Sequence, residues 1–137
     1  MMNTQLPPEL FYTTLTAAFT ALIWVPIILN RLAETGVWSA LRNPQPDVRP
    51  HADWAYRLAN AHRNALENLV VFAPLAITVH LMGVGSAATA LWSLAFFVAR
   101  VAHALIYALG VPLLRTVAFF VGFLAQMVLA LRILGVA

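Results

Sequence analysis

Four long apolar segments divide the chain, and each is about as long as a membrane-spanning helix. They cover residues of about 10–30, 54–82, 87–109 and 113–134. A helix needs about 20 mostly apolar residues to cross a hydrocarbon core of about 30 Å. Backbone groups cannot stay unpaired in lipid, so we expect each segment to be an α-helix. The pattern predicts an all-α membrane protein, a bundle of four transmembrane helices, with residues 1–137 as one domain.

Prolines and short polar residues mark the expected helix ends. Pro26 should kink or end the last turn of the first helix, and Pro74 should bend the second. We expect Asp53 to cap the second helix and Ser86 to cap the third. Residues 32–52 contain several prolines and form the only long polar connection, which predicts an extended loop at the membrane surface.

The composition agrees with insertion in a bilayer. Hydrophobic residues make up 62% of the chain and charged residues 9%, against about 25% charged residues in a soluble domain. The net charge is +3, and the arginines are spread over apolar segments without a basic stripe, so nucleic acid is not an expected partner. The chain has no cysteine, which means that any thiol chemistry needs a bound ligand. Its four histidines are scattered, and we expect no metal site.

Arginines cluster around the first and third connections between helices. Those at the first are Arg31, Arg42, Arg49, Arg57 and Arg63, and those at the third are Arg100 and Arg115. The positive-inside rule places these connections in the cytoplasm and both termini outside, in a multi-pass integral membrane protein. In a bacterium this would be the inner membrane. The polar helix ends would then meet on the cytoplasmic side.

A polar face interrupts the second apolar segment near its start. Its members are Arg57, Asn60, Asn64, Glu67 and Asn68, and they fall within an arc of about 100° on a helix. Glu67 lies about 15 Å along the helix axis from Arg57, which is roughly halfway into the hydrocarbon core. A carboxylate at that depth is costly, so this face is expected to line a site or a helix interface.

The third and fourth helices carry matching polar faces. These faces consist of Arg100, His103 and Tyr107 on the third helix and of Arg115, Phe119, Gly122 and Gln126 on the fourth. Guanidinium groups bind carboxylates, a glutamate binds an ammonium group, and asparagine amides suit peptide groups. The combination indicates a small ligand with at least two carboxylates and one amine, held in a partly apolar slot.

Some of these residues also have purely structural interpretations. Arg63 and Glu67 are spaced i, i+4 and could form an ion pair. Gln126 lies deep in the fourth helix, where an interhelical hydrogen bond is the favoured role. Taken alone, His62 is better explained by packing or by a subunit interface, because it points away from the polar face.

The residues resemble those of a known family. The motif Arg57-x-x-x-Ala-His62-Arg-Asn64-x-x-Glu67-Asn68 resembles the signature of the membrane-associated proteins in eicosanoid and glutathione metabolism, the MAPEG family. Arg100-Val-Ala-His103-x-x-x-Tyr107, followed by Arg115-Thr116, is similar to the second half of the family's microsomal prostaglandin E synthases. The resemblance covers nearly the whole chain, extends to the microsomal glutathione transferases, and implies a homotrimer with glutathione bound between neighbouring subunits at the cytoplasmic side.

The resemblance also implies roles for individual residues. Arg115 matches the arginine that stabilises the glutathione thiolate, and would be the catalytic residue. Positions that match glutathione-binding residues, or that lie next to them, are Arg31, Arg57, His62, Asn64, Glu67, Arg100, His103 and Tyr107. The implied function is a glutathione-dependent transferase or peroxidase that acts on lipophilic electrophiles entering from the bilayer lipids.

Four positions depart from the family pattern and keep a second function open. Asn60 replaces an arginine that grips the ligand, Thr116 a serine, Phe119 a tyrosine and Ala65 an aspartate. The changes at Phe119 and Ala65 argue against prostaglandin isomerase chemistry. The alternative is a non-catalytic trimeric scaffold or lipid-binding protein with a degenerate glutathione site. A transporter is less favoured, because no inverted repeat is evident.

Overall fold

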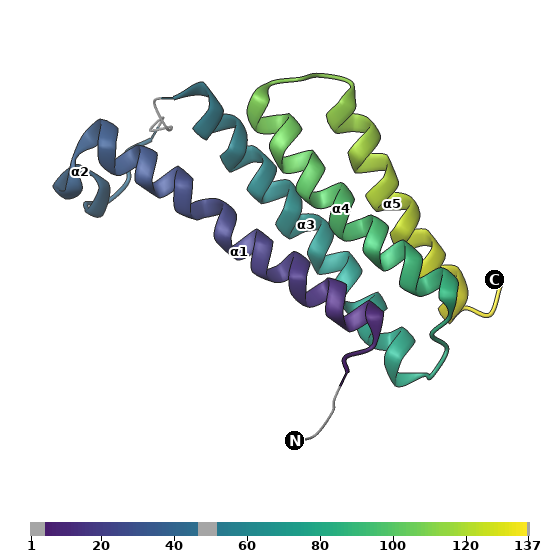
Figure 1. The fold of residues 1–137 in the computed structure, drawn as a ribbon. Coiled ribbons are helices and arrows are strands. Elements are labelled where there is room, and N and C mark those ends of the chain that lie inside the picture. The colour runs from purple at the N-terminus through teal and green to yellow at the C-terminus, as the bar shows by residue number, and fades with distance from the viewer. Residues whose placement is uncertain (1–4, 47–51, 137) are drawn as a thin grey trace.

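Four helices, each long and apolar enough to cross a membrane, pack side by side (Figure 1). The computed structural model describes residues 5–46 and 52–136. Its elements are α1 (Pro8–Thr35), a short α2 (Val37–Leu41), α3 (Asp53–Leu81), α4 (Ala87–Leu109) and α5 (Leu114–Ile133). The predicted fold class, an all-α bundle with four transmembrane helices, is confirmed.

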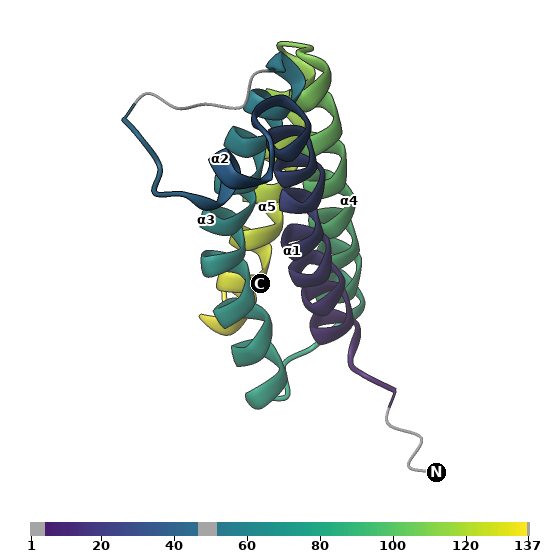
Figure 2. The ribbon, with the colours of Figure 1, turned by 90° about the vertical axis from the view of Figure 1, so that its left-hand side faces the viewer.

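Neighbouring segments of the chain run in opposite directions, so the helix ends are sorted between two ends of the bundle. At one end α1 and α4 finish and α3 and α5 begin (Figure 1). We call this the polar end, because it carries Arg31, Arg57 and Arg115. Figure 2 shows α1 alongside α4, and the N-terminal segment leaves from the opposite end of the bundle.

The connection between α1 and α3 is more helical than the sequence analysis predicts. α1 passes through Pro26 and continues to Thr35, so the proline does not end it. A proline is tolerated inside a membrane helix, and the first effective break is Gly36, which has a φ of 80°. α2 follows directly. The expectation of an extended loop is therefore wrong for 32–41, and 47–51 lie outside the described residues.

The predicted caps of α3 and α4 had different outcomes. Ala52 precedes α3 as its N-cap without a side-chain hydrogen bond, and Asp53 is already the first helical residue, so the predicted Asp53 cap is wrong. The carboxylate still lies in the first turn, where the helix dipole favours negative charge. Ser86 caps α4 as predicted: its Oγ accepts from the Thr89 N–H at 3.2 Å. The Thr89 hydroxyl donates to the buried Glu9 carboxylate, which joins the starts of α1 and α4.

Two apolar clusters hold the helices together. The cluster away from the polar end contains Phe72, Ala76, Val79, Phe96, Ala125 and Leu129, and the cluster nearer the polar end contains Ile23, Leu58, Ala61, Ala65 and Ala104. The rings of Phe72 and Phe96 stack with centroids 3.8 Å apart. Small residues let helix backbones approach closely in membrane bundles. The alanine-rich cluster therefore brings α1, α3 and α4 close together just below the polar end.

Phe96→Ala should destabilise the bundle more than removal of a phenylalanine on its surface. The Phe96 ring is fully buried against Phe72, and truncation of a buried phenylalanine costs about 3–5 kcal/mol in proteins. The measurement is the thermal midpoint of the detergent-solubilised protein. Phe120→Ala is the matched control, since Phe120 is 56% exposed and should lower the midpoint much less. Equal losses would contradict the assigned core.

Candidate functional site

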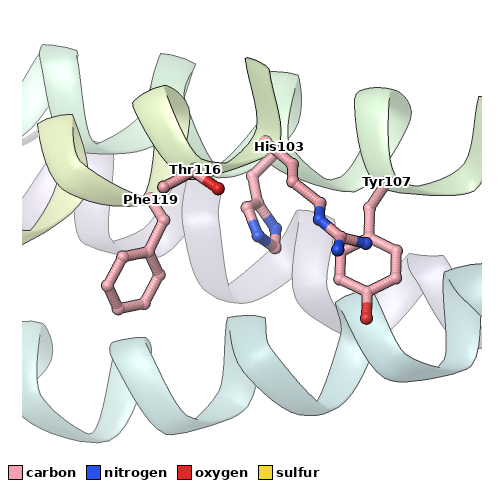
Figure 3. A pocket seen from close by; sticks show the side chains of 5 residues that line it. His103, Tyr107, Thr116 and Phe119 are labelled. Atoms are coloured by element: carbon pink, nitrogen blue, oxygen red, sulfur yellow. The ribbon is translucent and has the colours of Figure 1, made fainter. Parts of the chain in front are cut away.

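An open cavity of about 240 Å³ lies at the polar end, between α4 and α5. Its lining residues are His103, Tyr107, Arg115, Thr116 and Phe119. In Figure 3 the rings of His103, Tyr107 and Phe119 point to the same side of the α4–α5 pair. The structure therefore brings together His103, Tyr107 and Arg115, which the sequence analysis assigns to one site on separate helices.

The tight connection between α4 and α5 positions Arg115. α4 ends at Gly110, which adopts the left-handed conformation with a φ of 75°, and α5 begins at Leu114. The Arg115 guanidinium carbon lies 4.6 Å from the centroid of the Tyr107 ring, a cation–π contact. His103 packs edge-on against the same ring at 5.6 Å. The cavity thus combines a fixed positive charge, an imidazole, a hydroxyl and aromatic surface.

Arg100 lies one helical turn deeper than the cavity lining and is only 1% exposed. Its Nη1 donates to Asn64 Oδ1 at 2.8 Å. Its Nε and Nη2 have no hydrogen-bond partner among the described residues. A Cβ on Gly122 would lie 3.2 Å from Nη2 and 3.3 Å from Nε, so the glycine leaves room for the guanidinium. The rings of Phe96 and Phe119, 5.8 and 5.7 Å away, partly compensate the buried charge.

Asn64, Asn68 and Gln126 form a hydrogen-bonded chain beside Arg100. The Gln126 Nε2 donates to Asn68 Oδ1 at 3.1 Å and to the Asn68 carbonyl at 3.3 Å. The Asn68 Nδ2 donates to the Asn64 carbonyl at 2.9 Å and to Asn64 Oδ1 at 3.3 Å. The interhelical hydrogen bond predicted for Gln126 is therefore confirmed, and it joins α5 to α3.

Arg57 and Arg31 lie at the polar end but do not line the cavity. The Arg57 Nε donates to the Ala108 carbonyl at 2.9 Å, so this arginine satisfies a carbonyl in the last turn of α4, where cations are favoured. Sequence analysis missed this contact, because a backbone carbonyl leaves no signal in residue identity. The Nε of Arg31 and the Oδ1 of Asn30 are buried without a hydrogen-bond partner among the described residues.

The remaining predicted site residues lie on other surfaces of α3. Glu67 and Arg63 are exposed, and no ion pair joins these two described residues, so the structural pair suggested by their spacing does not form. His62 is half-buried and does not line the cavity. The Asn60 side chain donates to the Tyr56 carbonyl of its own helix at 3.3 Å. Within a single chain, therefore, neither Glu67 nor His62 lines the cavity.

An apolar groove of about 360 Å³ also lies between α4 and α5, and none of its lining residues belongs to the cavity described above. Only apolar side chains line it, including Ala95, Ala99 and Ala102 on α4 and Val117 and Val121 on α5. Sequence analysis did not identify this groove. The available signal is the i, i+4, i+7 spacing of the alanines, which places small side chains along one face of α4.

The profile of the MAPEG family matches residues 10–135 of the chain, which is almost its whole length. No curated protein matches the chain.

Gly122→Ala should destabilise the protein through the Arg100 guanidinium. An added Cβ would meet Nη2 and Nε at 3.2 and 3.3 Å, so the guanidinium, which is enclosed on its other sides, would have to move by a few tenths of an ångström and strain its bond to Asn64. Glycine to alanine in a helix interior otherwise stabilises by about 0.5–1 kcal/mol. The measurement is the thermal midpoint in a double-mutant cycle. In an Arg100→Leu background Gly122→Ala should become neutral or stabilising, and an unchanged cost there would disprove the contact.

Proposed function

The chain belongs to the MAPEG family, and from this premise we propose that it is an integral membrane, glutathione-dependent transferase or peroxidase that acts on lipophilic electrophiles. The observation that carries the proposal is the cavity at the polar end. It opens in a membrane-spanning bundle and contains the Arg115 guanidinium beside His103 and Thr116. A nearby cation in a partly apolar site is the environment that favours a thiolate over a thiol.

The polar residues assigned to the site, one in the cavity and the others elsewhere on the bundle, fit a tripeptide with two carboxylates and an ammonium group. Guanidinium groups are supplied by Arg115 in the cavity and by Arg31, whose Nε is buried without a partner among the described residues. Asn64 offers an amide, and Glu67 offers an exposed carboxylate for an ammonium group. When bound, glutathione would supply a thiolate nucleophile that attacks an electrophilic carbon or a peroxide oxygen.

The residues that line the cavity have separate roles in this proposal. Arg115 holds the sulfur in its anionic form, and its position is fixed by the Tyr107 ring. Phe119 and the neighbouring apolar side chains present an apolar wall to the electrophile. Because the site lies within membrane-spanning helices, lipophilic substrates would reach it from the bilayer rather than from water.

We further propose that the site is completed in a homotrimer. Glu67 lies within a membrane-spanning helix and is exposed in one subunit, and an ionised carboxylate facing lipid is costly. A second copy packed against this face of α3 would remove that cost and would bring Glu67 and His62 next to a neighbouring cavity. The arginines at the polar end support a cytoplasmic location for this end, with both termini outside.

A second function is favoured by one observation. Asn60 occupies the position of a ligand-gripping arginine in the resemblance, and its side chain bonds to the Tyr56 carbonyl of its own helix instead of reaching outward. A site without that cation fits a trimeric scaffold or lipid-binding protein in which glutathione is no longer held.

Arg115→Ala should abolish formation of the thiolate while leaving the assembly intact. The charge that stabilises the sulfur anion would be lost, whereas within the described residues Arg115 makes no hydrogen bond and contacts the Tyr107 ring through a cation–π interaction. The measurement is the ultraviolet difference absorbance of the thiolate on addition of glutathione, together with conjugation of a hydrophobic aryl halide. Arg42→Ala is the matched control, since Arg42 is exposed at the end of α2. Unchanged turnover in Arg115→Ala would refute this role.

Millimolar glutathione should raise the thermal midpoint of the detergent-solubilised protein. A ligand at about 100 times its dissociation constant stabilises the folded state by about 2.7 kcal/mol. The rise should disappear in Glu67→Ala and persist in Glu34→Ala, a control that removes an exposed carboxylate near the end of α1. A wild-type protein that shows no shift would favour the scaffold or lipid-binding function.

A further inference from the structure

The hydrogen bonds around Asn64 fix the direction in which its amide can recognise a ligand. An asparagine amide has one oxygen that accepts and one NH2 group that donates, and which of them faces a partner follows from that partner's chemistry. A guanidinium has no acceptor. The atom of Asn64 that lies 2.8 Å from Arg100 Nη1 must therefore be the oxygen.

The orientation of the next two amides is fixed in the same way. A backbone carbonyl only accepts, so the atom of Asn68 that lies 2.9 Å from the Asn64 carbonyl must be its NH2 group. For the same reason the atom of Gln126 that lies 3.3 Å from the Asn68 carbonyl is its NH2 group. The side chains then donate in one direction, from Gln126 to Asn68 and from Asn68 to Asn64.

This arrangement leaves Asn64 with a donor only. Its Oδ1 accepts from both Arg100 and Asn68, which occupies both lone pairs of the oxygen. Its Nδ2 has no hydrogen-bond partner among the described residues, and the side chain is only half-buried. Arg100, in contrast, is 1% exposed and sealed by Gly122 and aromatic rings, so it does not itself reach a ligand in this subunit.

Taking Asn64 as a ligand-binding residue of the proposed function, we infer that Arg100, Asn68 and Gln126 are positioning residues that leave its NH2 group for an acceptor oxygen of the ligand, a carboxylate or a peptide carbonyl. The inference rests on the proposed glutathione site, and it specifies which groups of the tripeptide Asn64 can bind. Ammonium and peptide N–H groups are excluded at this position. The effect of the positioning residues should fall with distance along the chain of hydrogen bonds, from Asn68 to Gln126.

Three variants test the inference by titration of glutathione against the thermal midpoint of the detergent-solubilised protein. Asn64→Asp keeps an acceptor for Arg100 and Asn68 but has no donor, so the dissociation constant for glutathione should rise at least about tenfold, the value of one good hydrogen bond. Repulsion between the introduced carboxylate and a ligand carboxylate would add to this loss of affinity. This repulsion also arises only if the ligand places an acceptor oxygen next to residue 64. The midpoint without ligand should not fall, because a carboxylate pairs well with Arg100.

Asn68→Leu and Gln126→Met test the positioning residues. Asn68→Leu should raise the dissociation constant about three- to tenfold and Gln126→Met by less, because each removes part of one hydrogen bond's effect. The thiolate absorbance at saturating glutathione should stay at the wild-type value, since Arg115 is untouched. General damage to the fold would lower both the affinity for glutathione and the thiolate absorbance. Thr16→Val is the control: Thr16 is fully buried but donates only to the Tyr12 carbonyl of its own helix.

The outcomes separate this inference from the proposed function. A wild-type dissociation constant for glutathione in Asn64→Asp, or in both Asn68→Leu and Gln126→Met, would overturn the inference, whereas the proposed glutathione site would stand. No binding of glutathione by the wild-type protein would overturn the proposed function and the inference together. In Asn68→Leu, the thiolate absorbance at saturating glutathione could instead fall by as large a factor as the affinity for glutathione. That result would show that Asn68 has only a structural role, and would overturn its positioning role.

Discussion

The burial of a guanidinium inside a membrane-spanning bundle constrains the rest of this structure. Water is not present in the hydrocarbon core to solvate Arg100, so its partners have to come from the protein. They are one amide oxygen from α3, two aromatic rings and the space left by Gly122 on α5. Three helices must therefore keep one register, because a shift of any of them would leave the charge without its compensation.

The same constraint separates two arginines that look equivalent in the sequence. Arg100 near the middle of α4 is sealed by side chains, whereas Arg115 in the first turn of α5 faces an open cavity across the Tyr107 ring. Depth and neighbours decide this difference. The sealed arginine bonds to an amide of its own chain, whereas the accessible one lines an open cavity, which is why the proposed chemistry is assigned to Arg115.

The sequence predicts the features that follow from insertion in lipid, but not those that depend on contacts between particular neighbouring residues. The four spans follow from apolar length, and the hydrogen bond of Gln126 follows from the cost of an amide at that depth. The extension of α1 to Thr35 was missed because the prolines of the connection suggested an extended chain, although no breaker lies between Pro26 and Gly36. A helical arc places Arg100, His103 and Tyr107 together, yet only His103 and Tyr107 line the cavity. The Arg100 guanidinium lies instead beside Gly122 on α5. The pattern of one helix could not predict this, because it carries no information about the residues of the helix that packs against it.

α3 has one face inside the bundle and one face directed outward. Asn68 is buried and bonded to α5, while the adjacent Glu67 is exposed. In water an exposed glutamate needs no explanation, but within a membrane span it requires a protein or ligand partner. The amide of Asn68 on one face fixes the orientation of Asn64, and the carboxylate on the other face has no ion-pair partner among the described residues. In the proposed trimer, α3 is thus the element through which subunit packing and ligand affinity depend on each other.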